Sequence, residues 1–80
     1  MSVNEAVALR VSELLNKHQM TQYRLEQKCA ITHGRLGCIM RNKNKTINLS
    51  TAMLLAQGFD MSLIEFLDSP YFDMSKLEID

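Results

Sequence analysis

Apolar residues recur every three or four positions along most of the chain, which is the spacing of one buried face of an α-helix. The first such stripe predicts a helix that is capped by Asn4 and ends near Lys17 or His18. Its inward residues are Val7, Val11, Leu14 and Leu15. No stretch alternates apolar and polar residues for long enough to form a strand, so the sequence predicts an all-α fold.

Two short helices are predicted next, each introduced by a threonine that can cap it. Thr21 precedes the segment 22–29, and Thr32 precedes the segment 33–41 after a connection of two residues. A helix, a short turn and a second helix form the layout of a helix-turn-helix, which requires the inward residues to meet in one apolar centre. These residues are Leu25, Cys29, Ile31, Leu36 and Ile39.

Two more helices are predicted in the second half of the chain. One begins at a cap on Asn48 or Ser50 and runs to Gln57, with Gly58 as its expected terminator. The other begins at Ser62 and stops before the proline of this chain, because proline cannot continue a helix. The inward residues expected for the first of the two are Met53, Leu54 and Ala56.

A chain of 80 residues with 46% hydrophobic residues has room for one small domain, and this composition excludes a disordered chain. The longest apolar runs fall far short of the roughly 18 residues that a membrane span needs. The N-terminus also lacks a basic region followed by an apolar core. We therefore expect a cytoplasmic protein with no membrane partner.

The net charge is zero, yet charge is separated along the chain. Residues 1–45 carry eight cations against three acids, a net +5, and residues 46–80 carry one cation against six acids, a net −5. Such separation makes the first half a candidate anion-binding surface. Its cations are Arg10, Lys17, Arg24, Lys28, Arg35, Arg41, Lys43 and Lys45.

The cysteines and histidines offer little chemistry. Cys29 and Cys38 are nine residues apart and, without a secretory signal, are not expected to form a disulfide. Together with His18 and His33 they supply ligand types that zinc uses, but the spacing matches no paired zinc motif. No metal or other cofactor is therefore expected. The same residues fall at packing or outward positions, so neither an enzyme nor a small-molecule substrate is expected.

The stretch MTQYRLEQKCAITHGRLGCIMRNKNK, followed by LSTAMLLAQGFDMSLIEFL, resembles the XRE family of Cro and phage-repressor type helix-turn-helix domains. The resemblance covers about residues 7–67. Its most specific parts are Thr21 with Gln22, the apolar series described above, and the closing GFDMSLIEFL. It implies a compact five-helix, lambda-repressor-like DNA-binding domain over 1–68, followed by a tail over 69–80. The implied function is a sequence-specific transcriptional regulator, expected to be a repressor.

The resemblance also implies roles for individual residues. Gln22 matches the family's helix-2 glutamine that touches phosphate, and the stretch 32–38 matches the part that reads bases. Lys43 and Lys45 fall in the loop that family members lay along the DNA backbone. The candidate DNA contacts are Gln22, Tyr23, Thr32, His33, Gly34, Arg35, Cys38, Arg41, Lys43 and Lys45.

These contacts have alternatives that the sequence leaves open. Arg35 is expected to pair with guanine, the commonest specific contact. His33 is either a phosphate or base contact or an exposed imidazole at a helix start. Cys38 is better interpreted as an ordinary side chain, with contact to a thymine methyl as the alternative.

Some residues depart from the family pattern. Glu26 replaces a small alanine, and Ala30 replaces the frequent turn glycine. Gly34 and Gly37 lie inside the predicted recognition helix, where each costs about 1 kcal/mol relative to alanine and reads no base. These glycines, with the zero net charge, favour a second hypothesis: a protein-binding helical domain, such as an antirepressor or inhibitory partner, that has lost DNA reading.

The last segment, 62–77, carries more apolar side chains than a five-helix core of this size can cover. Exposed apolar patches usually mark interfaces, so we expect a homodimer. Two-fold pairing would place the recognition helices about 34 Å apart on double-stranded DNA and favour an inverted-repeat operator. The candidate dimerisation residues are Ile64, Phe66, Leu67, Tyr71 and Phe72.

Overall fold

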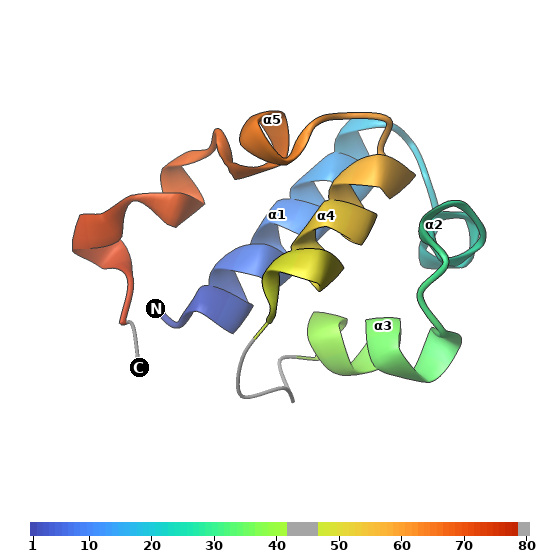
Figure 1. Cartoon of the computed structure of the whole chain (residues 1–80), viewed down its shortest axis with the longest axis horizontal. Coiled ribbons are helices and arrows are strands. Elements are labelled where there is room, and N and C mark those ends of the chain that lie inside the picture. The colour runs from blue at the N-terminus through green and yellow to red at the C-terminus, as the bar shows by residue number, and fades with distance from the viewer. Residues whose placement is uncertain (42–46, 79–80) are drawn as a thin grey trace.

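The computed structural model describes residues 1–41 and 47–78, and these residues form an all-helical domain (Figure 1). The five α-helices are α1 (Val3–Lys17), α2 (Gln22–Cys29), α3 (His33–Met40), α4 (Leu49–Gly58) and α5 (Leu63–Leu67). Two 3-10 turns follow, η1 (Pro70–Phe72) and η2 (Met74–Lys76). Within the described ranges, the β-structure is limited to an isolated bridge between Ser2 and Glu78. The all-α prediction is confirmed.

Polar side chains cap the helices, and the caps of α2 to α5 are those predicted: Thr21, Thr32, Asn48 and Ser62. The prediction for α1 was wrong. Ser2 caps this helix: its hydroxyl accepts from the Glu5 amide at 3.1 Å, and the Glu5 carboxylate accepts from the Ser2 amide at 3.4 Å. This reciprocal pair satisfies two amides at once. Asn4 instead lies inside α1, where it is buried.

The core lies where the inner faces of the five helices meet. Helix α2 packs against α4, α3 and η1 pack against α1, and α5 packs against α4. Phe66 of α5 is fully buried, and the ring of Phe72 lies 6.2 Å from it. The other buried members of this core are Val7, Val11, Leu14, Leu25, Cys29, Ile31, Leu36, Ile39, Leu55, Ala56 and Phe59.

Helix α4 faces the core with a different side from the one predicted. Met53 is 53% exposed, whereas Leu55 is fully buried and Leu54 only partly so. Ala56 is buried as expected. The buried face of α4 consists of Thr51, Ala52, Leu55, Ala56 and Gly58, and Met53 lies outside it.

Gly58 is not the left-handed residue that was expected to follow α4. It belongs to the helix as its last residue, and the residue with a left-handed conformation is Asp60, with φ 57°. A Cβ at Gly58 would lie 2.7 Å from Cδ1 of Leu25 and 2.8 Å from Cβ of Cys29. This glycine therefore lets α2 and α4 approach each other. An ion pair reinforces the contact, since Nζ of Lys28 lies 2.6 Å from the Asp60 carboxylate and its hydrogen bond lowers the pKa of that carboxyl.

The segment after α5 folds back onto the start of the chain. The Glu78 amide donates to the Met1 carbonyl at 2.8 Å, and the Met1 amino group donates to the Lys76 carbonyl at 2.9 Å. The two ends of the described chain consequently lie together, at the opposite end of the domain from α2 (Figure 1). Within the described part of the predicted tail 69–80, η1 packs against α1.

Candidate nucleic-acid interface

Helices α2 and α3 are joined by a turn of three residues whose conformation is set locally. Ala30 ends α2 in the left-handed conformation, with φ 58° and ψ 28°. The Thr32 hydroxyl then accepts from the Arg35 amide at 3.3 Å and begins α3. In Figure 1 α2 is viewed end-on while α3 lies across the page, so the two helices cross at a steep angle. The left-handed residue is an alanine, although glycine adopts this conformation at lower cost.

The inner side of this unit is as predicted. All five expected residues are buried and belong to the core cluster. Their burial fixes which side of α3 faces outward. The residues are Leu25, Cys29, Ile31, Leu36 and Ile39.

The environments of the two cysteines differ. Cys29 is buried, and burial raises the pKa of its thiol, with the charge of Glu26 acting in the same direction. Cys38 is half-buried on α3. The thiolate is the reactive form of a cysteine. Burial keeps reagents away from the Cys29 thiol, and its raised pKa keeps the thiol protonated.

We therefore expect alkylation of the native protein by iodoacetamide near neutral pH to modify Cys38 first, with Cys29 slower by at least about tenfold, since both burial and a raised pKa oppose its reaction. Peptide mass spectrometry over a time course measures the two rates. The Cys38→Ala variant serves as control and should take up label slowly until the protein is unfolded. Faster modification of Cys29 in the folded protein would contradict this packing.

The outer face of α3 is open at its beginning. His33, Gly34 and Arg35 are exposed, and a Cβ built on Gly34 would meet nothing within 4 Å. Another molecule could therefore approach the backbone of α3 closely at Gly34. Thr32, just before the helix, is also exposed.

Arg35 reaches from α3 to the first turn of α4. Its Nη2 donates to the hydroxyl of Thr51, which is buried. The Thr51 amide in turn donates to the side-chain oxygen of Asn48, the α4 cap, at 2.8 Å. A guanidinium has five N–H donors, so this anchor holds Arg35 in place and leaves most of its donors for a partner.

Arg41 lies at the other end of α3, over the second glycine of this helix. A Cβ on Gly37 would come within 3.0 Å of Nη1 of Arg41. Gly37 therefore makes room for the guanidinium of Arg41. Arg41 is exposed. The two arginines flank the half-buried Cys38.

Glu26 of α2 pairs with His33 of α3, across the turn. Nδ1 of the imidazole lies 2.7 Å from Oε2 of the carboxylate. The Glu26 side chain is only 11% exposed, whereas that of His33 is 87% exposed. The carboxylate is thus nearly buried and holds an imidazole that lies at the surface. Its unfavourable effect on an approaching anion is reduced when the imidazole is protonated.

Two of the predicted cations support the fold instead. Arg10 donates to the carbonyls of Phe66 at 2.8 Å and Glu65 at 2.9 Å, and pairs with Glu13 at 2.6 Å. It therefore holds α5 against α1. Lys28 is paired with Asp60, as described above.

The other described cations of the first half, Lys17, Arg24, Arg35 and Arg41, form no ion pair with a described carboxylate. Lys43 and Lys45 lie outside the described residues. Gln22 and Tyr23, at the start of α2, are exposed. The described candidates thus lie at the starts of α2 and α3 and along the outer face of α3.

The predicted dimerisation residues do not form one surface. Phe66 is fully buried and belongs to the core, because α5 packs its ring against α1, α4 and η1. Ile64 is 82% exposed, Leu67 is exposed, and Tyr71 and Phe72 are half-buried. A surface patch suited to an interface is therefore limited to Ile64, Leu67 and their exposed neighbours.

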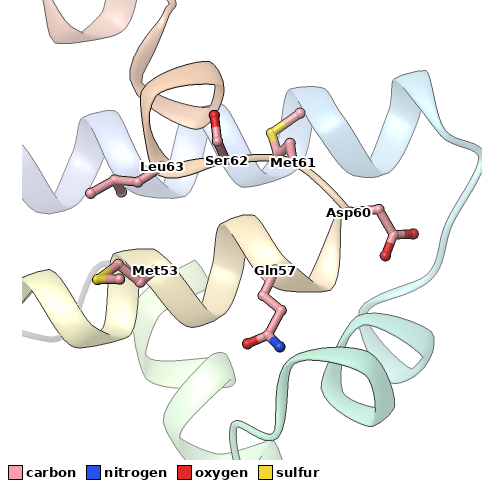
Figure 2. A pocket seen from close by; sticks show the side chains of 6 residues that line it. All are labelled: Met53, Gln57, Asp60, Met61, Ser62 and Leu63. Carbon is pink, nitrogen blue, oxygen red and sulfur yellow. The ribbon is translucent and has the colours of Figure 1, made fainter.

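A shallow pocket of about 490 Å³ lies beside this patch, between α4 and the segment that leads into α5 (Figure 2). Met53 and Gln57 line it from α4, Asp60 to Ser62 line it from the connecting segment, and Leu63 lines it from the start of α5. Its apolar side chains are partly exposed, and its polar groups do not converge on a point as a catalytic site would require.

The described residues contain no group of three or more histidine, cysteine, aspartate or glutamate side chains able to hold a metal ion. No helix in residues 1–41 and 47–78 has both the length and the apolar character needed to cross a membrane. No protein-family model, curated protein or solved structure matches this chain.

Two interactions of this surface were not foreseen from the sequence: Glu26 with His33, and Arg35 with Thr51. The residues of each pair come from different helices, seven and sixteen positions apart. Helical periodicity indicates which side of a helix a residue occupies, but not which side chain of another helix it meets.

Proposed function

We propose that this protein is a cytoplasmic, sequence-specific DNA-binding transcriptional regulator, a repressor, in which α2, the turn and α3 act as a helix-turn-helix. The observation that carries this proposal is the two-sided character of α3. Leu36 and Ile39 anchor one side in the core, while the exposed residues Arg35, beside that buried side, and Arg41, opposite it, carry guanidinium groups without an ionic partner among the described residues.

The geometry of α3 suits the major groove of B-DNA. That groove is about 12 Å wide and admits an α-helix. Gly34 removes a side chain from the leading edge of α3, so its backbone could come close to the base edges, with Arg35 beside it to contact guanine. Gln22 and Tyr23 would contact phosphate from the start of α2, where free backbone amides favour an anion.

A dimer would place two such helices on an inverted repeat. We propose that a second copy of the chain covers the exposed apolar residues of α4 and α5, Met53, Ile64 and Leu67. In Figure 1 α5 lies above α1 and α4 and α3 lies below them, so pairing through α5 would leave both recognition helices free. A light-scattering mass of one chain at tens of micromolar, with and without an inverted-repeat duplex, would contradict the dimer.

The first test is binding to random genomic duplexes at about 50 mM salt, where the electrostatic contribution is large. Binding that weakens steeply with added salt supports the proposal. Absence of binding would overturn it and leave the second candidate, a protein-binding helical domain. The observation that favours this candidate is that Gly34 and Gly37 leave few side chains on α3 to read bases.

The expected phosphate contact of Lys43 is testable by salt dependence. Lys43→Ala is expected to weaken binding to all duplexes alike and, in a dimer, to flatten the slope of log affinity against log salt by up to about 1.8, since each phosphate contact contributes about 0.9. Fluorescence anisotropy between about 50 and 200 mM salt measures the slope. Lys76→Ala, which removes a cation from η2, is the control and should leave the slope unchanged. Equal slopes for both variants would assign no phosphate contact to Lys43.

A further inference from the structure

The Glu26 and His33 pair joins α2 to the exposed beginning of α3. The 2.7 Å contact involves Nδ1 of the imidazole, and the carboxylate that holds it is almost covered. The imidazole itself is almost entirely exposed. Glu26 therefore holds the ring from the protein side, while the other ring nitrogen, Nε2, is left without a carboxylate partner among the described residues.

The pair determines which ring nitrogen carries a proton. An ionised carboxylate only accepts hydrogen bonds, so Nδ1 must be the donor. In the neutral ring, Nε2 then has a free lone pair and acts as an acceptor. When the ring is protonated, Nε2 carries a hydrogen and becomes a donor.

The charged surroundings of the ring are simple. Within the described residues, Glu26 on α2 is the carboxylate in contact with His33. Cys29, also on α2, is close enough for the charge of Glu26 to raise its thiol pKa, and its burial raises that pKa further, so it stays neutral. On α3 itself, Arg35 is turned toward Thr51 of α4.

We propose that Glu26 is a positioning residue, which fixes His33 so that the unprotonated Nε2 accepts a hydrogen bond from the exocyclic amino group of adenine or cytosine in the major groove. Adenine N6 and cytosine N4 present donors there, whereas guanine and thymine present acceptors. Protonation of His33 makes Nε2 a donor and reverses the preference toward guanine or thymine. This inference rests on the proposed function, because α3 must lie in the groove.

The first experiment tests the tautomer in the free protein, with no DNA. Long-range ¹H–¹⁵N NMR spectra at about pH 8, where imidazole is neutral, distinguish the two ring nitrogens. We expect the proton of His33 on Nδ1 in the wild type and mainly on Nε2 in Glu26→Ala. His18, which lies beside Phe59, is the internal control and should not change. A proton on Nε2 in the wild type would overturn the inference and leave the proposed function untouched.

The second experiment selects binding sites from random duplexes with the wild type, Glu26→Ala and His33→Ala. At about pH 8 the wild type should prefer adenine or cytosine at one position in each half-site by about fivefold, as expected for one neutral hydrogen bond. At a lower pH, chosen so that the NMR signals of His33 show the ring protonated, the preference should move toward guanine or thymine. Both variants should lose the preference and its pH dependence. The exposed neighbour Gln27→Ala is the matched control and should retain both.

The outcomes separate the two proposals. A site selection in which His33→Ala keeps the wild-type preference overturns the reading role of His33 but leaves DNA binding intact. A double variant that loses more base preference than His33→Ala alone shows that Glu26 acts by another route, which overturns its positioning role. Circular dichroism first shows that the wild-type protein has its normal helical content. If this folded protein then binds no duplex at all, the proposed function and the base-reading role are overturned together.

Discussion

Phe66→Ala is expected to lower the free energy of unfolding by about 3–5 kcal/mol, because it empties the centre of the core. Phe66 is fully buried and is among the largest such side chains in the described part of the chain. A domain of this length has a total stability of about 4–12 kcal/mol, so the loss is a large share of it. Urea unfolding followed by circular dichroism measures the change, and the melting temperature should fall by at least about 12 °C.

Ile64→Ala is the matched control, two positions away on the same short helix. Ile64 is 82% exposed, so this variant should change the free energy of unfolding by less than about 0.5 kcal/mol. Both variants are compared at a concentration where light scattering gives the mass of one chain, because dimerisation would add to apparent stability. If Phe66→Ala cost no more than Ile64→Ala, Phe66 would not be a core residue. If Ile64→Ala weakens self-association alone, the proposed dimer surface gains support.

The positions of the helices were largely predictable because the signals for them are local. A threonine cap followed by apolar residues at helical spacing identified α2 and α3, and both begin where Thr21 and Thr32 cap them. The error at the start of α1 has the same local origin. Ser2 and Glu5 form a reciprocal pair in the sequence spacing that characterises this cap, and that pattern was there to be read in place of Asn4.

The orientation of α4 was not predictable in this way. This helix is apolar on several sides, so periodicity alone does not decide whether Met53 or Leu55 faces inward. The decision comes from α2, which approaches α4 at Gly58. Such a close approach depends on the fit of two helices that are distant in sequence, and a glycine near a helix end equally suggests a terminator.

In the candidate site, too, the features set within one helix were predictable and the contacts between helices were not. Exposure of Gly34 followed from the burial of Leu36 and Ile39, because helical geometry places it on the opposite side of α3. His33 and Arg35 lie at the two flanks of the buried side, and both are exposed in the structure. The contacts made by these side chains did not follow, since their partners lie on other helices. Phe66 was misassigned to an interface for a related reason: composition shows an excess of apolar residues in a segment, but not which of them the fold covers.

Arg35→Ala is expected to lower sequence discrimination while leaving background binding in place. A bidentate contact between arginine and guanine is worth about 1–3 kcal/mol, so affinity for the preferred duplex should fall about fivefold to more than a hundredfold per half-site. Affinity for random DNA should change little. Arg35→Lys keeps the charge but loses the bidentate geometry, so it should resemble the alanine variant on the preferred duplex and the wild type on random DNA. Competition binding with both duplexes at one salt concentration measures the ratio.

The anchor of Arg35 makes this prediction specific to the structure. Thr51→Val removes the hydroxyl that accepts from Nη2 while keeping nearly the same shape, so Arg35 loses the contact that orients it. Discrimination should fall by part of the Arg35→Ala effect, and in an Arg35→Ala background Thr51→Val should cause no further loss, because the two side chains act as one unit. Ser50→Ala, an exposed neighbour on α4, controls for a general effect on this helix. Additive losses in the double variant would mean that Thr51 supports DNA reading without Arg35. If Arg35→Ala left discrimination unchanged, Arg35 would not read a base.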